Sequence, residues 1–201
     1  MDSLNKLIEY FGEFPGIGPR QARRFAYFLL TKNPVYLEEL SRLIAEVKKN
    51  VHTCNSCFRF YTSNKNSGMC SICSDAHRDR SVLMIVARDV DLEAIEKSHT
   101  YEGLYFVLGG AVPILEKFPE TRIRSRELLS HLEKTPPKEI ILSLNANPEG
   151  EHTADTLREI VRPFVDKNSI KVSVLGRGLS TGTELEYSDT DTIKNALKNR
   201  A

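Results

Sequence analysis

Apolar side chains recur at helical spacing, mainly at positions i, i+3, i+4 and i+7, through the N-terminal part of the chain. Three such stripes, over residues 4–11, 22–29 and 37–47, predict three helices. Ser3 is the expected N-cap of the first helix, and Pro19 suits the first position of the second. We expect the third stripe to be buried as well, because an apolar helix face is normally stabilised by packing against a core.

Beyond residue 80 the pattern changes to short apolar runs that alternate with helical stripes. The runs that predict strands lie at 82–87, 104–108, 139–144 and 170–175. The stripes that predict helices lie at 92–97, 125–134, 153–164 and 190–198. Alternation of strands and helices is typical of a mostly parallel sheet with helices on both faces. The expected fold class is therefore α/β, preceded by a helical module.

Composition narrows the class of protein. Hydrophobic residues make up 40% of the 201 positions, which is enough for a packed core and too much for a disordered chain. The longest apolar runs, at 25–30 and 82–87, have six residues each, whereas a membrane-spanning helix needs about 20. The N-terminus lacks the basic and apolar regions of a signal peptide, so we expect a cytoplasmic protein without membrane contact. The net charge of +1 excludes a protein that coats nucleic acid through a uniformly basic surface, but it is compatible with a local basic patch.

All four cysteines lie in two CxxC pairs, Cys54 with Cys57 and Cys70 with Cys73, separated by twelve residues. Each pair can offer two thiolates from one tight turn, and zinc takes four ligands in a tetrahedron. The polar run 62–67 is expected to form the turn between the pairs. The pattern predicts one structural Zn²⁺ per chain, with a closed ligand shell and no catalytic position. One alternative is four reduced, buried thiols. The other is two redox CxxC motifs, but such a motif usually stands at the start of a helix that follows a strand, and the sequence does not show that arrangement at both pairs.

Between the first two predicted helices the chain reads FPGIGPR, residues 14–20. Glycine tolerates positive φ, so this segment predicts a tight turn, and the helix N-terminus after it can hold phosphate. From residue 14 to residue 37 there are four basic residues and no acidic one. The segment resembles the helix-hairpin-helix family of DNA-binding modules, and its contacts would be with phosphates, independent of sequence. The candidate DNA-binding residues are Gly16, Ile17, Gly18, Arg20, Arg23 and Arg24. The alternative is an ordinary helical turn with a solvated basic face.

The predicted strand 139–144 runs into the segment LSLNANPEGE, residues 142–151. Ligands of α/β sheets gather at the carboxyl ends of strands. The segment is similar to the Toprim domain of topoisomerases and primases, in which one strand ends in Glu, a later one ends in Asp-x-Asp, and these acids hold Mg²⁺. Here Ala87 stands in place of the Glu, and Asn145 and Asn147 stand in place of the two Asp. Because Mg²⁺ prefers carboxylates, we expect the fold without the metal chemistry, and no catalytic residues.

Several acidic residues lie near predicted helix starts. Glu149 and Glu151 precede the helix at 153–164, where the helix dipole stabilises carboxylates. They are expected either to cap that helix or to contact a basic partner protein. The triplets at 89–91 and 189–191 also precede helices and are interpreted as caps. The glycine-rich run 176–182 lacks the Lys-Ser/Thr of a P-loop and is interpreted as a structural loop.

The order of these modules along the chain resembles that of one family. A helix-hairpin-helix comes first, a four-cysteine site follows with CSICSD at 70–75, a Toprim segment is next, and LEYSD at 185–189 comes near the end. The stretches at 101–108 and 149–154 add to the likeness. Over essentially its whole length the chain resembles the RecR family of bacterial recombination mediators. The domains expected on this basis are a helix-hairpin-helix module, a zinc finger, a Toprim domain and a C-terminal segment, over residues 1–53, 54–78, 79–175 and 176–201.

The resemblance implies a non-enzymatic protein of the bacterial cytoplasm that acts at DNA in the nucleoid. Members of the family assist RecO, and in some settings RecF, in placing RecA on single-stranded DNA coated by single-strand-binding protein. They form ring-like homotetramers that can surround DNA, with the C-terminal segment reaching a neighbouring copy. On that pattern Arg20 and Arg24 match basic positions of the DNA-contacting hairpin, and Glu149 matches a Toprim acid implicated in contact with RecO. The alternatives are a Mg²⁺-dependent Toprim nuclease or primase-like enzyme, and a zinc-containing protein adaptor without DNA binding.

Overall fold

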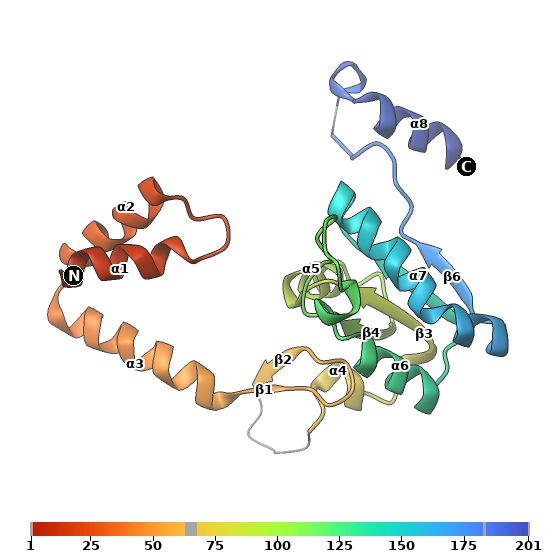
Figure 1. Cartoon of the computed structure of the whole chain (residues 1–201), viewed down its shortest axis with the longest axis horizontal. Coiled ribbons are helices and arrows are strands. Elements are labelled where there is room, and N and C mark those ends of the chain that lie inside the picture. Colours follow the sequence, from red (N-terminus) through yellow and green to blue (C-terminus); the bar gives the residue numbers. More distant parts are fainter. Residues whose placement is uncertain (1, 63–67, 183, 201) are drawn as a thin grey trace. The chain divides into compact units, whose positions relative to one another are not determined.

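The computed structural model describes residues 2–62, 68–182 and 184–200 (Figure 1). The chain divides into two compact units, residues 1–51 and 52–201. The turn expected over 62–67 lies, apart from Thr62, outside the described residues. Within the described ranges no helix is long and apolar enough to cross a membrane.

Three helices form the N-terminal unit, as the periodicity predicts. They are α1 (Ser3–Gly12), α2 (Pro19–Leu30) and α3 (Pro34–Asn50). Pro19 occupies the first turn of α2, where its missing N–H is not needed. The N-cap of α1 is Asp2 rather than Ser3, because the Asp2 carboxylate accepts a hydrogen bond from the Leu4 backbone N–H at 3.2 Å.

The apolar faces of α1 and α2 pack on each other, whereas that of α3 stays exposed. Ala22 and Ala26 are almost fully buried, and the rings of Phe11 and Phe25 meet edge to face with centroids 5.9 Å apart. The prediction that α3 buries its stripe is wrong for the single chain: no α3 residue is buried, and Ile44 is 66% exposed. Periodicity identifies the apolar face of a helix, but it does not say whether the same chain covers that face.

The second unit is built on a four-stranded parallel sheet. Its strands are β3 (Asp79–Val86), β4 (Gly103–Val107), β5 (Glu139–Ser143) and β6 (Lys171–Val174). They lie in the order β4-β3-β5-β6, and every neighbouring pair is parallel. The four expected strands and the parallel sheet are thus confirmed. Although β4 is an edge strand of this sheet, all five of its residues are buried, so another segment must cover it.

Side chains of the sheet alternate between two covered faces. Leu83 and Ile85 of β3 point to the face that packs against α6 (Ser125–Lys134) and α7 (Pro148–Asn168). Met84 and Val86 point to the other face, together with Leu92 of α5 (Asp89–Ser98) and the four cysteines. Helices therefore cover both faces, as predicted, but the cysteine cluster shares the second face with α5.

Short elements complete the second unit. The cysteines lie around a two-stranded sheet, β1 (Val51–Thr53) and β2 (Phe60–Thr62), and the one-turn helix α4 (Ser71–Ser74). The other elements are the 3₁₀ turns η1 (Pro119–Thr121) and η2 (Leu185–Tyr187) and the helix α8 (Thr190–Lys198). Helix α7 begins at Pro148 rather than at residue 153, because Asn147 caps it earlier than its apolar stripe suggests.

Candidate metal centre and nucleic-acid interface

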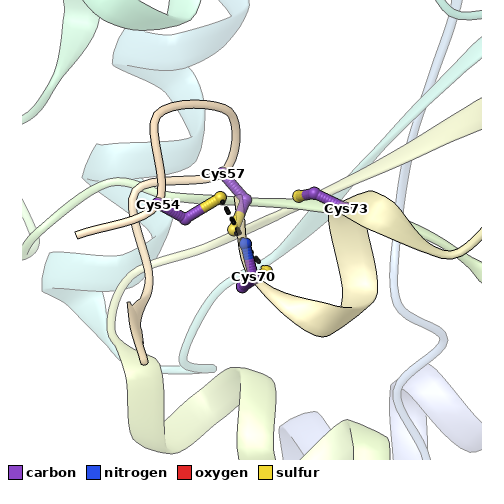
Figure 2. A group of neighbouring side chains, drawn as sticks. All are labelled: Cys54, Cys57, Cys70 and Cys73. Atoms are coloured by element: carbon purple, nitrogen blue, oxygen red, sulfur yellow. Dashed lines mark hydrogen bonds between the residues drawn. The ribbon is translucent and has the colours of Figure 1, made fainter. Parts of the chain in front are cut away.

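The two CxxC pairs come together in one buried cluster. Cys54 and Cys57 lie in the turn between β1 and β2, Cys70 is the N-cap of α4, and Cys73 lies within α4. All four side chains are buried, and their Sγ atoms lie within 4.8 Å of one another. Figure 2 shows the loop with the first pair facing the short helix with the second. The expected convergence of the two pairs is therefore present in the structure.

The spacing of the sulfurs suits a tetrahedral metal ion. Zinc–sulfur bonds of about 2.3 Å place the sulfurs of such a site about 3.8 Å apart, and Cys57 Sγ lies 3.6 Å from Cys70 Sγ. The Cys70 backbone N–H donates to Cys54 Sγ at 3.4 Å, which favours a thiolate there (Figure 2). Hydrogen bonding with Cys57 lowers the pKa of the Cys54 thiol, and the same contact raises the pKa of Cys57. Four soft, closely spaced sulfurs fit Zn²⁺ in a closed structural site.

Backbone geometry explains how the first pair of cysteines reaches the second. Phe58 directly after Cys57 has φ +62°, and its N–H donates to the Cys54 carbonyl at 3.0 Å, which closes the turn. The Asn55 N–H in the same turn donates to the carbonyl of Gly68 at 2.9 Å. This bond joins the first CxxC loop to the segment that leads into the second pair.

The cysteine loop also covers the edge of the sheet. The Val107 N–H of β4 donates to the Cys57 carbonyl at 2.8 Å, and the Phe58 ring packs on Phe106 with centroids 5.3 Å apart. The Arg124 guanidinium donates to the Val107 carbonyl at 2.9 Å and lies 5.6 Å from the Phe58 ring centroid. Asp89 at the start of α5 accepts from the Phe60 N–H at 2.7 Å. The cysteine loop is thus part of the core of the α/β unit.

The predicted turn between α1 and α2 is present, and its two glycines have different roles. Gly16 has φ +77°, a conformation that favours glycine, whereas Gly18 is extended and serves as the N-cap of α2. A Cβ atom added at either position would meet nothing within 4 Å, so the turn is open. Ile17 between them is half-buried, and its N–H donates to the Phe14 carbonyl at 3.0 Å. The turn therefore leaves backbone surface accessible at the start of α2.

Arginines surround this open helix start. Arg20, Arg23 and Arg24 are all exposed, and none forms an ion pair with any residue that the structure describes. Arg20 and Arg24 leave α2 on the side opposite the buried Ala22 and Ala26, and Arg23 leaves it on the flank between these two sides.

Pro19 has no N–H and the Gln21 N–H donates to the Gly18 carbonyl at 3.0 Å, so among the described residues the Arg20 N–H is the one left free in the first turn of α2. This N–H and the exposed guanidinium groups together favour an anion.

The Toprim-like face carries uncharged side chains at the three positions compared with Toprim acids, beside the carboxylates of Asp91 and Glu149. Ala87 is 5% exposed, and Asn147 caps α7 by accepting from the Gly150 N–H at 2.8 Å. Together with Asn145 and Glu149, they line a recess of about 70 Å³. In the described parts of the chain, the cysteines form the only cluster of three or more His, Cys, Asp or Glu side chains close enough to share an ion. Asn147 therefore serves as the N-cap of α7.

The acidic residues singled out in the sequence take several roles. Glu149 is exposed in the first turn of α7, whereas Glu151 forms an ion pair with Arg177 of the glycine-rich run. Asp189 caps α8 and Asp91 accepts from a backbone N–H at the start of α5, as interpreted. Asp89, the first acid of the triplet at 89–91, accepts a hydrogen bond from the Phe60 N–H instead, because the start of α5 lies beside the cysteine loop. Sequence reasoning missed Arg124, since no motif marks a side chain that joins β4 to the cysteine turn.

Comparison with known proteins identifies the family of this chain. Residues 4–48 match the family model described as RecR, helix-hairpin-helix, and residues 81–176 match the Toprim domain. The Recombination protein RecR of Bifidobacterium longum subsp. infantis is 37% identical over 198 residues, covering 98% of this chain and 95% of the relative. The Recombination protein RecR of Myxococcus xanthus is 37% identical over 199 residues, covering 99% and 97%. That of Lactobacillus johnsonii is 35% identical over 198 residues, covering 98% and 96%. The chain therefore belongs to the RecR family, as its order of modules predicts.

Proposed function

We propose that this chain is a non-enzymatic recombination mediator in DNA repair, which binds DNA and helps RecO, and in some settings RecF, to load RecA on single-stranded DNA. The observation that carries this proposal is the N-terminal hairpin of a RecR-family chain: an open turn, a free Arg20 N–H at the helix start, and three exposed arginines that pair with no described acid. The proposed DNA-contacting residues are Gly16, Ile17, Gly18, Arg20, Arg23 and Arg24.

In this proposal the contacts are with the DNA backbone. The open turn lets a phosphate approach the free Arg20 N–H in the first turn of α2, and the Arg20 and Arg24 guanidinium groups donate to neighbouring phosphate oxygens. Such contacts position the protein but carry no base information, so binding is independent of sequence and weakens with salt.

The metal proposed for the cysteine cluster is one Zn²⁺ per chain, held by Cys54, Cys57, Cys70 and Cys73. Four thiolates close its coordination, so the ion supplies structural cross-linking only. The cysteine residues would then hold the β1–β2 turn against α4, and the Cys57 carbonyl would keep its hydrogen bond to the Val107 N–H of β4.

The absence of catalysis is part of the proposal. Ala87, Asn145 and Asn147 replace the three acids that a Toprim enzyme uses for Mg²⁺, and uncharged side chains bind that ion poorly. We expect no nuclease or phosphotransfer activity with Mg²⁺ or Mn²⁺. Reproducible Mg²⁺-dependent cleavage that disappears in Glu149→Gln would favour the enzyme alternative.

Partner and self-association surfaces complete the proposal. Glu149 is the proposed contact with RecO; Glu151 would assist it after release from Arg177. We propose a homotetrameric ring, in which the exposed apolar stripe of α3 and the segment 176–201 meet neighbouring copies. The exposure of Ile44 and Val47, 66% and 57%, supports such a contact, because apolar patches of this kind are usually covered in an assembly.

The test follows RecA filament formation on single-stranded DNA coated with single-strand-binding protein. RecO together with this chain is expected to accelerate filament formation, whereas either protein alone is not. Glu149→Gln is expected to lose the acceleration while keeping DNA binding, and Glu159→Gln, at an exposed position further along α7, is the matched control. Equal filament rates with and without the chain would contradict the proposal.

A further inference from the structure

The outer face of α2 carries aromatic side chains directly beside the arginines. Arg20, Arg24 and Phe28 are four residues apart, so they form a row that winds slowly along the helix, with a rise of about 6 Å at each step. Arg23 and Tyr27 form a second row next to it. The opposite face of the helix is the one that packs against α1.

These rings are exposed although burial would stabilise them. Tyr27 is 56% exposed and Phe28 is 49% exposed. Just beyond the end of α2, the ammonium of Lys32 lies 4.2 Å from the centroid of the Phe28 ring and 5.7 Å from that of Tyr36. Cations and aromatic rings therefore interleave along one surface, in the order cation, cation, ring, cation.

We propose that this surface binds single-stranded nucleic acid, with phosphates on Arg20, Arg24 and Lys32 and bases stacked on Phe28 and Tyr27. On binding, the Lys32 ammonium would exchange its place over the Phe28 ring for a phosphate. Interleaved cations and exposed rings are what sequence-independent binding of a single strand requires, because every unpaired base offers a flat face. A duplex hides those faces between its base pairs and presents only phosphates and base edges to the arginines. The arginines thus serve both forms of DNA, whereas the rings select the single strand. This inference rests on the proposed function, since it uses the same hairpin.

Charge favours nucleic acid over a second copy of the chain on this face. Residues 14–37 hold four cations and no acid. An interface between two copies of this face would bring like charges together, which opposes association, whereas a phosphate backbone neutralises them. The row also continues directly from the open turn at Gly16, so one strand can contact the turn and then the rings.

The test compares the affinity of the full-length protein for a thymidine oligonucleotide with its affinity for a duplex of equal length, at low salt and without RecO. Phe28→Leu keeps an apolar side chain but removes the flat ring. We expect it to weaken single-strand binding about tenfold and to leave duplex binding unchanged. The matched control is Tyr10→Leu, which removes a similarly exposed ring (53%) from α1, between Glu9 and Glu13 in the sequence.

The arginine variants separate this inference from the proposed function. Arg20→Ala with Arg24→Ala is expected to weaken both DNA forms; if it weakens neither, the hairpin is not the DNA site and both proposals are wrong. If it weakens both forms but Phe28→Leu leaves the single-strand preference unchanged, only the stacking inference is overturned. The stacking inference alone is also overturned if Phe28→Leu lowers the solution mass together with the affinities for single-stranded and duplex DNA. The Phe28 ring would then lie in an interface between copies of the chain.

A tryptophan variant tests stacking even if Phe28→Leu folds poorly. The chain contains no tryptophan, so Phe28→Trp introduces a single indole at the proposed stacking position. We expect its fluorescence to be quenched by the thymidine oligonucleotide and not by the duplex. Equal fluorescence with and without the oligonucleotide, at concentrations where it is bound, would overturn the inference.

Discussion

The cysteine cluster and the N-terminal hairpin are both candidate functional sites, yet their surroundings differ in kind. Every cysteine is at most 4% exposed, and the Cys57 carbonyl of the cysteine loop accepts a hydrogen bond from the Val107 N–H of the sheet. The three hairpin arginines are exposed, and no described acid pairs with them. Groups that are satisfied within one chain hold its structure together, whereas unsatisfied groups on a stable helix are available to bind.

The apolar surfaces of the two units differ in the same way. Both faces of the sheet are covered, one by α6 and α7 and the other by α5 and the cysteine cluster. In the N-terminal unit the stripe of α3 and the rings of α2 are open. Changes in the core of the second unit should therefore appear as lost stability, and changes on the open faces of the first unit as lost association.

Removing a metal ligand is expected to have the largest effect. Zinc binding in such sites contributes on the order of 10 kcal/mol to folding, so Cys57→Ser should be insoluble or have an unfolded α/β unit. Metal analysis and circular dichroism measure this outcome, and Ser56→Ala in the same turn is the matched control. Wild-type protein that is purified without chelator and contains no zinc would contradict the prediction.

A charge introduced into the exposed apolar stripe of α3 tests whether the N-terminal unit mediates association. Ile44→Glu should lower the solution mass, and DNA binding should fall about a hundredfold or more, because several linked hairpins bind with avidity. Helix content should not change, since Ile44 is 66% exposed. Light scattering and fluorescence anisotropy measure the two effects, with Ser41→Glu as the control. An unchanged mass would show that this stripe is not the contact between copies.

Removing two arginines should affect binding alone. Arg20→Ala with Arg24→Ala should flatten the slope of log K against log salt by about 1 to 2 units, for all DNA sequences alike. Stability and zinc content should match wild type, because both side chains are exposed. Arg42→Ala, which removes an exposed arginine paired with Glu46 on α3, is the control. An unchanged slope would place the DNA site elsewhere in the molecule.

The smallest effect is expected at the cap of α7. Asn147→Ala should lower the free energy of unfolding by about 1 kcal/mol, because the Gly150 N–H loses its side-chain acceptor. Asn147→Asp keeps an acceptor and should be as stable as wild type in thermal denaturation. Neither variant should change DNA binding. A large loss in both variants would mean that the amide at this position has another role.

Much of the fold was predictable because its signals are local. The spacing of Cys54, Cys57, Cys70 and Cys73 predicted one cluster, and short apolar runs predicted the four strands. The Gly-x-Gly turn and the arginines after it predicted the hairpin. The start of α7 was placed too late, because Asn147 acts through a cap and not through periodicity.

The sequence by itself determined the parallel α/β sheet, the four-cysteine site and the basic turn, since each follows from spacing between residues close in the chain. Only the tertiary structure decided that the cysteine loop covers the β4 edge, that Arg124 joins the two, and that the stripe of α3 is left open. These contacts, or their absence, depend on which distant segments meet in the fold. Local periodicity carries no information about that, because it identifies an apolar or charged face without identifying its partner.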